Sequence, residues 1–264
     1  PVLGGTVEVR GDVSSQFLSG LLLAGAVMPR GLKIELTTPL VSKPYVDLTV
    51  AVMEAFGSRV HGLHVPFSGY VGQAGYEIEP DASAASYFFA AAAITGGRVT
   101  VEGLHADSAQ GDVAFVRILE RMGAHVTWEP NAITVRGTGT LRGVDADLRD
   151  ISDTAQTLAV VAAFAESPVG LTGIGFIRHK ETDRIGNTVR ELQRAGIAAE
   201  ERPDGFVVHP GTPTAARIET YDDHRMAMSF ALLGLKVPGI EIADPDCVGK
   251  TFPEFWSAFE SLRS

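Results

Sequence analysis

Two hydrophobic periodicities alternate along the chain. Short runs with alternating apolar and polar residues, such as Gly5–Val9 and Leu32–Leu36, predict strands. Longer apolar runs that follow Ser, Asp or Pro predict helices, because these residues suit the free N–H groups of a first turn. We expect the first helix from Ser14 or Ser15 through Met28 and the second over residues 45–56.

Glycines mark a longer period. One set separates a helix-like run from a strand-like run, at intervals of 66, 73 and 69 residues: Gly31, Gly97, Gly170 and Gly239. A second set follows the first three members at a constant offset of 26 residues and ends a second helix, where Gly is the usual C′ residue: Gly57, Gly123 and Gly196. A constant inner offset with drifting outer intervals indicates one repeated supersecondary unit.

The repeated unit has the order strand, helix, strand, helix, then two strands. Residues 59–65 and 68–71 would close the first copy as paired strands. The second and third copies have helices near 83–93, 112–122, 153–165 and 181–195. The fourth has a helix over 223–235, a strand over 240–243 and a helix over 253–262. The pattern therefore predicts an α/β fold of repeated β-α-β-α-β-β units, about four copies with the last incomplete. We expect another segment, upstream or on another chain, to supply its closing strands.

Composition is that of a globular protein. The chain has 264 residues, 45% hydrophobic and 20% charged, which suits one large or two modest domains. Its longest apolar stretches are too short to span a bilayer, so we expect no membrane. The formal net charge of −10 argues against a nucleic-acid partner, although a local basic cluster can still attract a small anion. The single cysteine, Cys247, predicts a half-buried inert thiol and fits the cytoplasm.

Hydroxyl and charged residues gather where the helices are expected to begin. Helix N-termini attract anions, so several of them converging would make a pocket for a multiply anionic ligand. The places are Ser14-Ser15-Gln16, Ser42-Lys43-Pro44-Tyr45, Asp153, residues 180–184 and residues 222–225. For the serines and for Asp153, a plain helix cap is the alternative interpretation.

The run from Lys180 to Arg184 is less ordinary, because cations in a first helical turn oppose the helix dipole. At i and i+4 these two residues would share one helix face. One interpretation is a surface ion-pair network. The other is a proton-transferring pair of Lys180 and Glu181 beside Arg184, which would bind a phosphate or carboxylate. Asp223-His224-Arg225 precedes an apolar run, so a buried Asp–Arg brace is the alternative to a site there.

Two classes of protein are disfavoured by missing patterns. Gly249-Lys250-Thr251 lacks the upstream glycine of a phosphate-binding P-loop, so we do not expect a P-loop NTPase. The remaining histidines have no metal-ligand spacing, so we expect no metal site.

Taken together, six runs resemble the motifs of EPSP synthases (3-phosphoshikimate 1-carboxyvinyltransferases), in the right order and across essentially the whole chain. They are Val13-Ser14-Ser15-Gln16-Phe17, Val41-Ser42-Lys43-Pro44-Tyr45, Gly111-Asp112-Val113, Lys180-Glu181-Thr182-Asp183-Arg184, Asp223-His224-Arg225-Met226-Ala227-Met228 and Lys250-Thr251-Phe252-Pro253. The resemblance implies the enolpyruvyl transferase fold, an inside-out α/β barrel in two lobes that close over the substrates. Residues 1–79 would be the C-terminal half of one lobe, and residues 80–264 most of the other.

The resemblance also implies a reaction, in which phosphoenolpyruvate and shikimate 3-phosphate give 5-enolpyruvylshikimate 3-phosphate and phosphate, without metal or organic cofactor. The residues implied for shikimate 3-phosphate are Ser14, Ser15, Gln16, Ser42, Tyr45, Asp153 and Lys180. Those implied for phosphoenolpyruvate are Gln16, Arg184, Arg225 and Lys250. Asp153 would accept the 5-hydroxyl proton, Glu181 with Lys180 or Lys250 would move the methylene proton, and His224 would steady that region.

The chain departs from the family pattern in two ways. Phe176 stands where many members have Asn, and the family's N-terminal motifs have no counterpart. Two other functions therefore stay open. One is a catalytically silent fragment that needs the N-terminal portion, as a segment or a separate chain. The other is a UDP-N-acetylglucosamine enolpyruvyl transferase, which shares the fold but lacks the Lys180–Arg184 motif.

Overall fold

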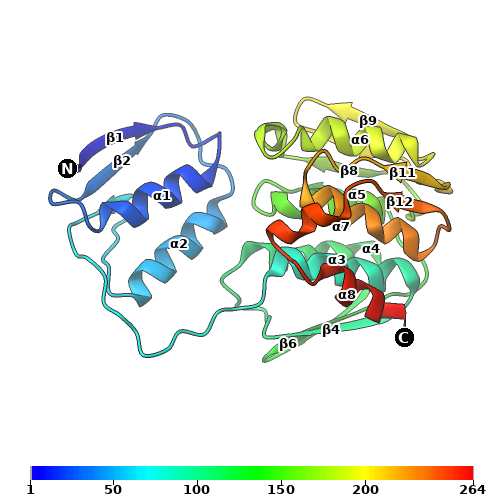
Figure 1. Cartoon of the computed structure of the whole chain (residues 1–264), viewed down its shortest axis with the longest axis horizontal. Helices are drawn as coiled ribbons and strands as arrows, with labels where there is room; N and C mark the ends of the chain where they lie inside the picture. Colours follow the sequence, from blue (N-terminus) through cyan, green and yellow to red (C-terminus); the bar gives the residue numbers. More distant parts are fainter. Residues whose placement is uncertain (1, 264) are drawn as a thin grey trace. The chain divides into compact units, whose positions relative to one another are not determined.

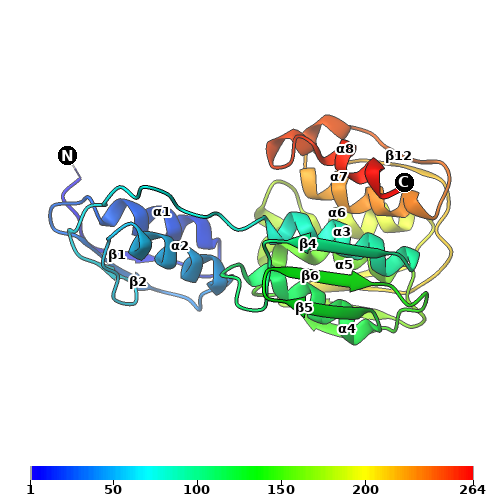
Figure 2. The ribbon, with the colours of Figure 1, turned by 90° about the horizontal axis from the view of Figure 1, so that it is seen from below.

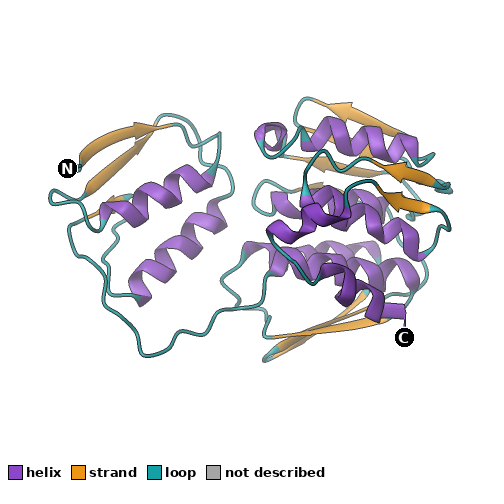
Figure 3. Cartoon of the chain, in the orientation of Figure 1, coloured by secondary structure: helices purple, strands orange, loops and turns teal. Residues whose placement is uncertain are grey.

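A computed structural model describes residues 2–263, and its contacts divide the chain into two compact units. Unit 1 comprises Pro1–Glu79 with Asp107–Gly111, and unit 2 comprises Pro80–Ala106 with Asp112–Ser264. Each unit has its own hydrophobic core and contains both helices and strands (Figure 3). The assignment of the two units to parts of two substrate-binding lobes stays a prediction.

Unit 1 is a small α/β layer in which two helices pack on a short sheet (Figure 1). Its elements are β1 (Gly5–Val9), α1 (Ser15–Gly25), β2 (Leu32–Leu36), α2 (Lys43–Ala55) and β3 (His64–Val65). β1 and β2 are parallel, and β3 pairs antiparallel with β2. Both long strands lie where the alternating pattern predicts them. The helices bury their apolar faces on the sheet through residues such as Leu18, Leu22 and Met53.

The paired strands expected over residues 59–65 and 68–71 are wrong. Only β3 forms from the first run. The second run forms no strand, because its backbone N–H groups bond elsewhere. Those of residues 68 and 69 donate to the carbonyl of Ala26 at 3.1 and 2.8 Å, and that of Val71 donates to the carbonyl of Phe56 at 2.7 Å. Satisfying carbonyls at the ends of α1 and α2 thus outcompetes a hairpin.

Unit 2 contains the remaining elements. Its helices are α3 (Ala82–Thr95), α4 (Phe115–Met122), α5 (Ala155–Ala162), α6 (Arg184–Arg194), α7 (His224–Ala231) and α8 (Phe255–Glu260). Its strands are β4 (Arg98–Glu102), β5 (His125–Glu129), β6 (Ala132–Arg136), β7 (Asp145–Asp147), β8 (Val169–Thr172), β9 (Ala199–Arg202), β10 (Gly205–Val208), β11 (Ala216–Ile218) and β12 (Ile240–Ile242). Short 3₁₀ turns are η1 (Gly111–Ala114), η2 (Ser152–Thr154), η3 (Gly175–His179), η4 (Leu232–Leu235), η5 (Pro245–Lys250) and η6 (Ser261–Arg263).

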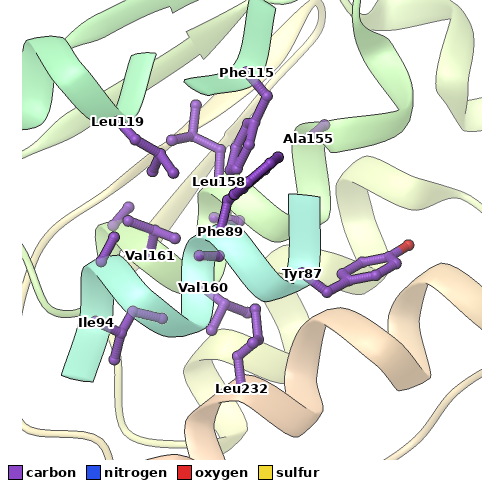
Figure 4. Close-up of a cluster of buried hydrophobic side chains, with 14 of the residues drawn as sticks. Tyr87, Phe89, Ile94, Phe115, Leu119, Ala155, Leu158, Val160, Val161 and Leu232 are labelled. Carbon is purple, nitrogen blue, oxygen red and sulfur yellow. The ribbon is translucent and has the colours of Figure 1, made fainter. Parts of the chain in front are cut away.

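Three apolar helices, α3, α5 and α7, form the centre of unit 2. Nearly every residue of these helices is buried, as expected for a helix that is hydrophobic on all sides. Phe89, Leu158 and Val161 are among the side chains that meet between them (Figure 4). The sheet of β4, β6 and β5 packs against α3 on one side of this group (Figure 2). Helices inside and sheets outside are the arrangement that the predicted inside-out barrel requires.

The repeated unit is complete in the third copy. There β7 and β8 are parallel, and β8 pairs with the antiparallel hairpin of β9 and β10. The second copy has the sheet β4–β6–β5, and the fourth has the parallel pair β11–β12. The glycines Gly57, Gly123 and Gly196 all have positive φ just after a helix, which confirms their predicted role. Gly170, however, lies inside β8 rather than between a helix and a strand.

Candidate anion-binding site

Asp153 is the centre of a cluster of charged side chains in unit 2. It lies in η2, where its side chain caps no helix and instead meets three cations. Its Oδ1 accepts from Lys180 Nζ at 2.6 Å and from Arg184 Nη1 at 3.1 Å, and its Oδ2 accepts from Arg225 Nη2 at 2.8 Å. Burial would raise the pKa of Asp153, but the nearby cations, Arg225 foremost, outweigh it and hold that pKa far below its usual range. The carboxylate is therefore ionised, and the cap interpretation is wrong.

Arg184, the first residue of α6, is almost completely buried at 1% exposure of its side chain. Its Nε and Nη2 donate to the two oxygens of Asp223 at 2.7 and 3.3 Å, a bidentate pair, and Nη2 also donates to Glu181 at 2.7 Å. Burial would lower the pKa of Arg184, but the facing Asp223 and Asp153 raise it. A buried Arg–Asp brace does exist, although its Arg is Arg184 rather than Arg225.

Arg225 reaches toward the cluster from the first turn of α7. Besides Asp153, its guanidinium donates to the hydroxyl of Tyr87 at 3.3 Å. Tyr87 comes from α3 and is fully buried, and its ring contacts the apolar core while its oxygen points away from the cluster of apolar side chains (Figure 4). Burial raises the pKa of Tyr87, so its hydroxyl stays protonated. Sequence reasoning missed Tyr87, because one Tyr in an apolar helix carries no signal for a site.

Glu181 and Lys250 form a second pair at the rim of the cluster. Lys250 Nζ donates to Glu181 Oε1 at 2.6 Å, and the Lys side chain is 56% exposed. Burial would raise the pKa of Glu181, but the bond from Lys250 and the charge of Arg184 lower it to about 2. Lys180, by contrast, bonds to Asp153. Of the two predicted proton partners of Glu181, the geometry therefore favours Lys250.

His224 is buried beside the brace. Its Nδ1 lies 3.8 Å from Asp223 Oδ1 and has no hydrogen-bond partner among the described residues. Burial, reinforced by the charge of Arg225, lowers the pKa of His224 to about 4. The imidazole is therefore neutral at pH 7.

The expectation that Lys180 and Arg184 share one helix face is wrong. Asp183 caps α6, accepting backbone N–H groups at 3.1 and 2.9 Å, so the helix begins at Arg184. Lys180 lies before it, at the end of η3, and meets Asp153 from the loop. The ring of Phe176, the departure from the family pattern, lies 5.9 Å from Lys180 Nζ, as in a cation–π contact.

The cluster as a whole carries more positive than negative charge. Four cations (Lys180, Arg184, Arg225, Lys250) meet three carboxylates (Asp153, Glu181, Asp223), while His224 is neutral. In a chain with a net charge of −10, this is a local positive site. Among the four cations, Lys180 and Lys250 are the most open to solvent, so an anionic ligand would meet them first. Among the described residues no group of His, Cys, Asp and Glu could hold a metal ion.

Unit 1 brings together the other predicted residues at the starts of its two helices. Ser14 caps α1 by accepting from the backbone N–H of Gln16 at 3.2 Å, so the cap interpretation holds for it. Ser15 is buried, while Gln16 is exposed. Because β1 and β2 are parallel, their following loops lie at the same edge of the sheet, and Val41 N–H donates to Gly11 O across them at 3.0 Å.

Ser42 and Tyr45 belong to the same edge of unit 1. Ser42 precedes α2 with a positive φ of 54° and is buried, and its carbonyl accepts from the N–H of Tyr45 at 3.2 Å. The side chain of Ser42 does not cap α2, so helix capping does not explain its strained backbone. Cys247, in unit 2, is half-buried, as predicted, and burial raises the pKa of its thiol to about 11, which disfavours the reactive thiolate.

Fold and site together define a class: α/β proteins of repeated units that hold a positive cluster at the starts of helices. A sequence profile of the family EPSP synthase (3-phosphoshikimate 1-carboxyvinyltransferase) matches residues 2–259. The chain belongs to this family.

Relatives and solved structures agree. The 3-phosphoshikimate 1-carboxyvinyltransferase of Methanosphaerula palustris is 45% identical over 98% of this chain, and that of Nostoc punctiforme is 45% identical over 97%. The structure of the EPSP synthase from Acinetobacter baumannii is 28% identical with a TM-score of 0.76, and covers 98% of this chain. The chain spans 62%, 61% and 62% of the length of these three proteins. No helix among the described residues is long and apolar enough to cross a membrane.

Proposed function

We propose that this chain carries part of the active site of an EPSP synthase, which transfers the enolpyruvyl group of phosphoenolpyruvate to the 5-hydroxyl of shikimate 3-phosphate and releases phosphate. The observation that carries the proposal is the cluster around Asp153 in a member of this family. Three of its four cations lie at or near the starts of α6 and α7, the fourth, Lys250, ends η5, and together they outnumber the three carboxylates. Both substrates are multiply anionic, and such a cluster suits them.

Phosphoenolpyruvate would bind at Arg225, Lys250 and Arg184, with Gln16 between the two substrates. Its planar carboxylate and its phosphate suit guanidinium forks. Arg184 already donates to Asp223, Glu181 and Asp153, so in this proposal it acts mainly by fixing those carboxylates. Shikimate 3-phosphate would bind at Lys180 and Asp153 together with the unit 1 residues Ser14, Ser15, Gln16, Ser42 and Tyr45.

The chemistry needs three proton transfers. The methylene carbon of phosphoenolpyruvate gains a proton while the 5-hydroxyl oxygen adds to its C2 and gives its own proton to Asp153. The Glu181–Lys250 pair, joined at 2.6 Å, suits the first transfer. In the second stage the same methyl group returns a proton to the Glu181–Lys250 pair as the C2–O bond to phosphate breaks, which restores the enol double bond. His224, neutral and buried beside Asp223, would steady this region without supplying charge.

Asp153 poses a requirement for this mechanism. A carboxylate held by three cations is a weak base, because its pKa lies far below the usual range. Substrate anions that draw Lys180 and Arg225 toward themselves would weaken that hold and raise the basicity of Asp153. The binding of substrates would thereby prepare the base.

A complementary upstream segment, in the same or a separate chain, is part of this proposal. In unit 2 a cavity of about 580 Å³ lies along β4, whose second edge has no strand partner among the described residues. Phe88, Val101 and Phe252 line it. An added strand could pair with β4 there and bury these side chains. The relatives, which are longer than this chain, would supply such a segment from their N-terminal part.

Two alternatives from the sequence remain distinguishable. A fragment that needs the N-terminal portion would be silent alone and would turn over only together with the upstream segment. A UDP-N-acetylglucosamine enolpyruvyl transferase would accept the nucleotide sugar, whereas the Lys180–Arg184 motif favours shikimate 3-phosphate. We further propose a cytoplasmic location, which suits the inert thiol of Cys247.

The test is phosphate release by the purified chain, alone and mixed with the part of the Methanosphaerula palustris relative that precedes the matched region. Both substrates are supplied, and UDP-N-acetylglucosamine replaces shikimate 3-phosphate in a parallel reaction. We expect release only from the mixture and only with shikimate 3-phosphate. A matched mixture with Arg225→Ala should lose roughly ten- to a hundredfold in rate, because a charged hydrogen-bond donor to the substrate is gone. Absence of release from every mixture would contradict the proposal.

A further inference from the structure

A strained turn leads directly into α7. The carbonyl of Thr220 accepts from the N–H of Asp223 at 2.9 Å, and the two residues between them, Tyr221 and Asp222, have φ of 55° and 57°. Turns of this kind favour Gly, Asn and Asp, and a bulky residue such as Tyr rarely adopts positive φ. Interactions outside the turn must therefore hold this conformation.

A buried carboxylate on α6 provides that hold. The hydroxyl of Tyr221 donates to Glu191 Oε1 at 2.6 Å, and the backbone N–H of Glu219 donates to Glu191 Oε2 at 3.0 Å. Glu191 is fully buried and plays no part in the cluster around Asp153. The guanidinium of Arg190 lies over the ring of Tyr221, 5.9 Å from its centre. We call the Tyr221–Glu191 hydrogen bond the turn clamp.

The turn is attached to α6 at two points. Arg184 and Glu191 are seven residues apart, so they lie on the same face of α6. Arg184 bonds to Asp223 just after the turn, and Glu191 bonds to Tyr221 within it. Asp223 also caps α7, accepting from the N–H of Arg225 at 2.9 Å. The position of the turn thus fixes where Asp223 meets Arg184. It also fixes the backbone position from which the Arg225 side chain extends.

We propose that Tyr221 is a positioning residue, which acts through the turn clamp to hold Asp223 against Arg184 and to set the placement of Arg225. Its importance for substrate binding rests on the proposed function, whereas its effect on Arg184 does not. Without the hydroxyl, the turn relaxes toward negative φ and Asp223 moves off Arg184. The Arg184 Nε–H then becomes accessible to water.

The test uses the full chain labelled with ¹⁵N-arginine. Hydrogen exchange of the Arg184 Nε–H is measured by NMR, and its resonance is assigned by its loss in Arg184→Lys. Tyr221→Phe should speed this exchange at least roughly tenfold, as expected when a hydrogen bond to a charged group is removed. Tyr70→Phe is the matched control, since it removes a tyrosine hydroxyl that donates to Leu23 O in unit 1. Equal exchange rates in Tyr221→Phe and the unmodified chain would overturn the proposal.

A rescue separates positioning from a general loss of stability. Glycine adopts positive φ without steric cost, so adding Asp222→Gly to Tyr221→Phe should restore at least half of the lost protection, on a logarithmic scale. Protection that stays lost in the double variant contradicts the role of the turn. In a mixture that releases phosphate, Tyr221→Phe should raise the KM for phosphoenolpyruvate about tenfold and leave that for shikimate 3-phosphate within about twofold. No release from the unmodified mixture would overturn the proposed function, while the exchange experiment would still decide the turn clamp.

Discussion

The two units hold their predicted site residues in opposite ways. In unit 1 these residues are hydroxyl, phenol and amide groups at two helix starts, and the ion pairs of the unit, such as Lys43–Asp47, are exposed. In unit 2 they are charged side chains apart from the neutral His224, and the Arg184–Asp223 pair is buried. A buried neutral hydroxyl needs only a hydrogen bond, whereas buried charges must fold with counterions. The carboxylates of unit 2 are therefore already paired with the cations that an anionic substrate would have to take from them.

The contrast should be largest when one buried partner is removed. Asp223→Ala leaves Arg184 without its bidentate partner and α7 without its cap, so unit 2 should lose about 3–5 kcal/mol of unfolding free energy. Urea unfolding followed by hydrogen exchange of unit 2 peptides measures this loss. Asp47→Ala in unit 1 is the matched control and should cost at most about 1 kcal/mol. Similar losses in the two variants would remove the distinction between the units.

The pH dependence of unit 2 should show the buried histidine. The pKa of His224 is about 4 in the folded state, below its ordinary 6.5, so the unfolded state binds more protons between these values. Stability should therefore be fully present above pH 6.5 and fall as the pH is lowered from 6.5 toward 4. Tm measured across this window should fall less than half as steeply in His224→Asn. An unchanged slope would mean that His224 is not held neutral.

A smaller effect is expected from a cap in unit 1. Ser14→Ala removes the acceptor of the Gln16 N–H and should destabilise α1 by about 1 kcal/mol. Hydrogen exchange of the first-turn amides of α1 is the appropriate measurement. Ser14→Asp, which keeps an acceptor, should retain most of the protection, and equal loss in both variants would show that the cap contributes nothing.

The smallest effect should come from the exposed ion pair of unit 1. Lys43→Ala removes a contact between two side chains that are both more than half exposed, so the change should stay within about 0.5 kcal/mol. Adding 0.5 M salt should abolish what effect there is. A loss above 1 kcal/mol would mean that unit 1, like unit 2, depends on its charges.

Local patterns predicted much of the fold. Alternation located β1 and β2, and glycines located the ends of helices, because both signals depend on neighbouring residues alone. The hairpin expected over residues 59–71 failed because its N–H groups had better acceptors at the helix ends, which no local pattern reveals.

The same limit applies to the candidate site. The sequence pointed to Asp153, Glu181 and Arg225 as charges at helix starts, and the structure brings them together. It could not show that Arg184 pairs with Asp223, or that Tyr87 meets Arg225, since these partners are separated by 39 and 138 residues. The expected helix face of Lys180 and Arg184 failed because Asp183 caps the helix one residue before Arg184.

We propose that the cations around Asp153 serve anionic substrates. The most direct measurement is the pKa of Asp153, followed by ¹³C NMR of its carboxyl carbon in the mixture with the upstream segment. Without ligand the pKa should lie far below its usual range. With shikimate 3-phosphate and an unreactive analogue of phosphoenolpyruvate, it should rise, because the cations then share their charge with the ligands. A pKa that stays unchanged at saturating ligand would contradict the account.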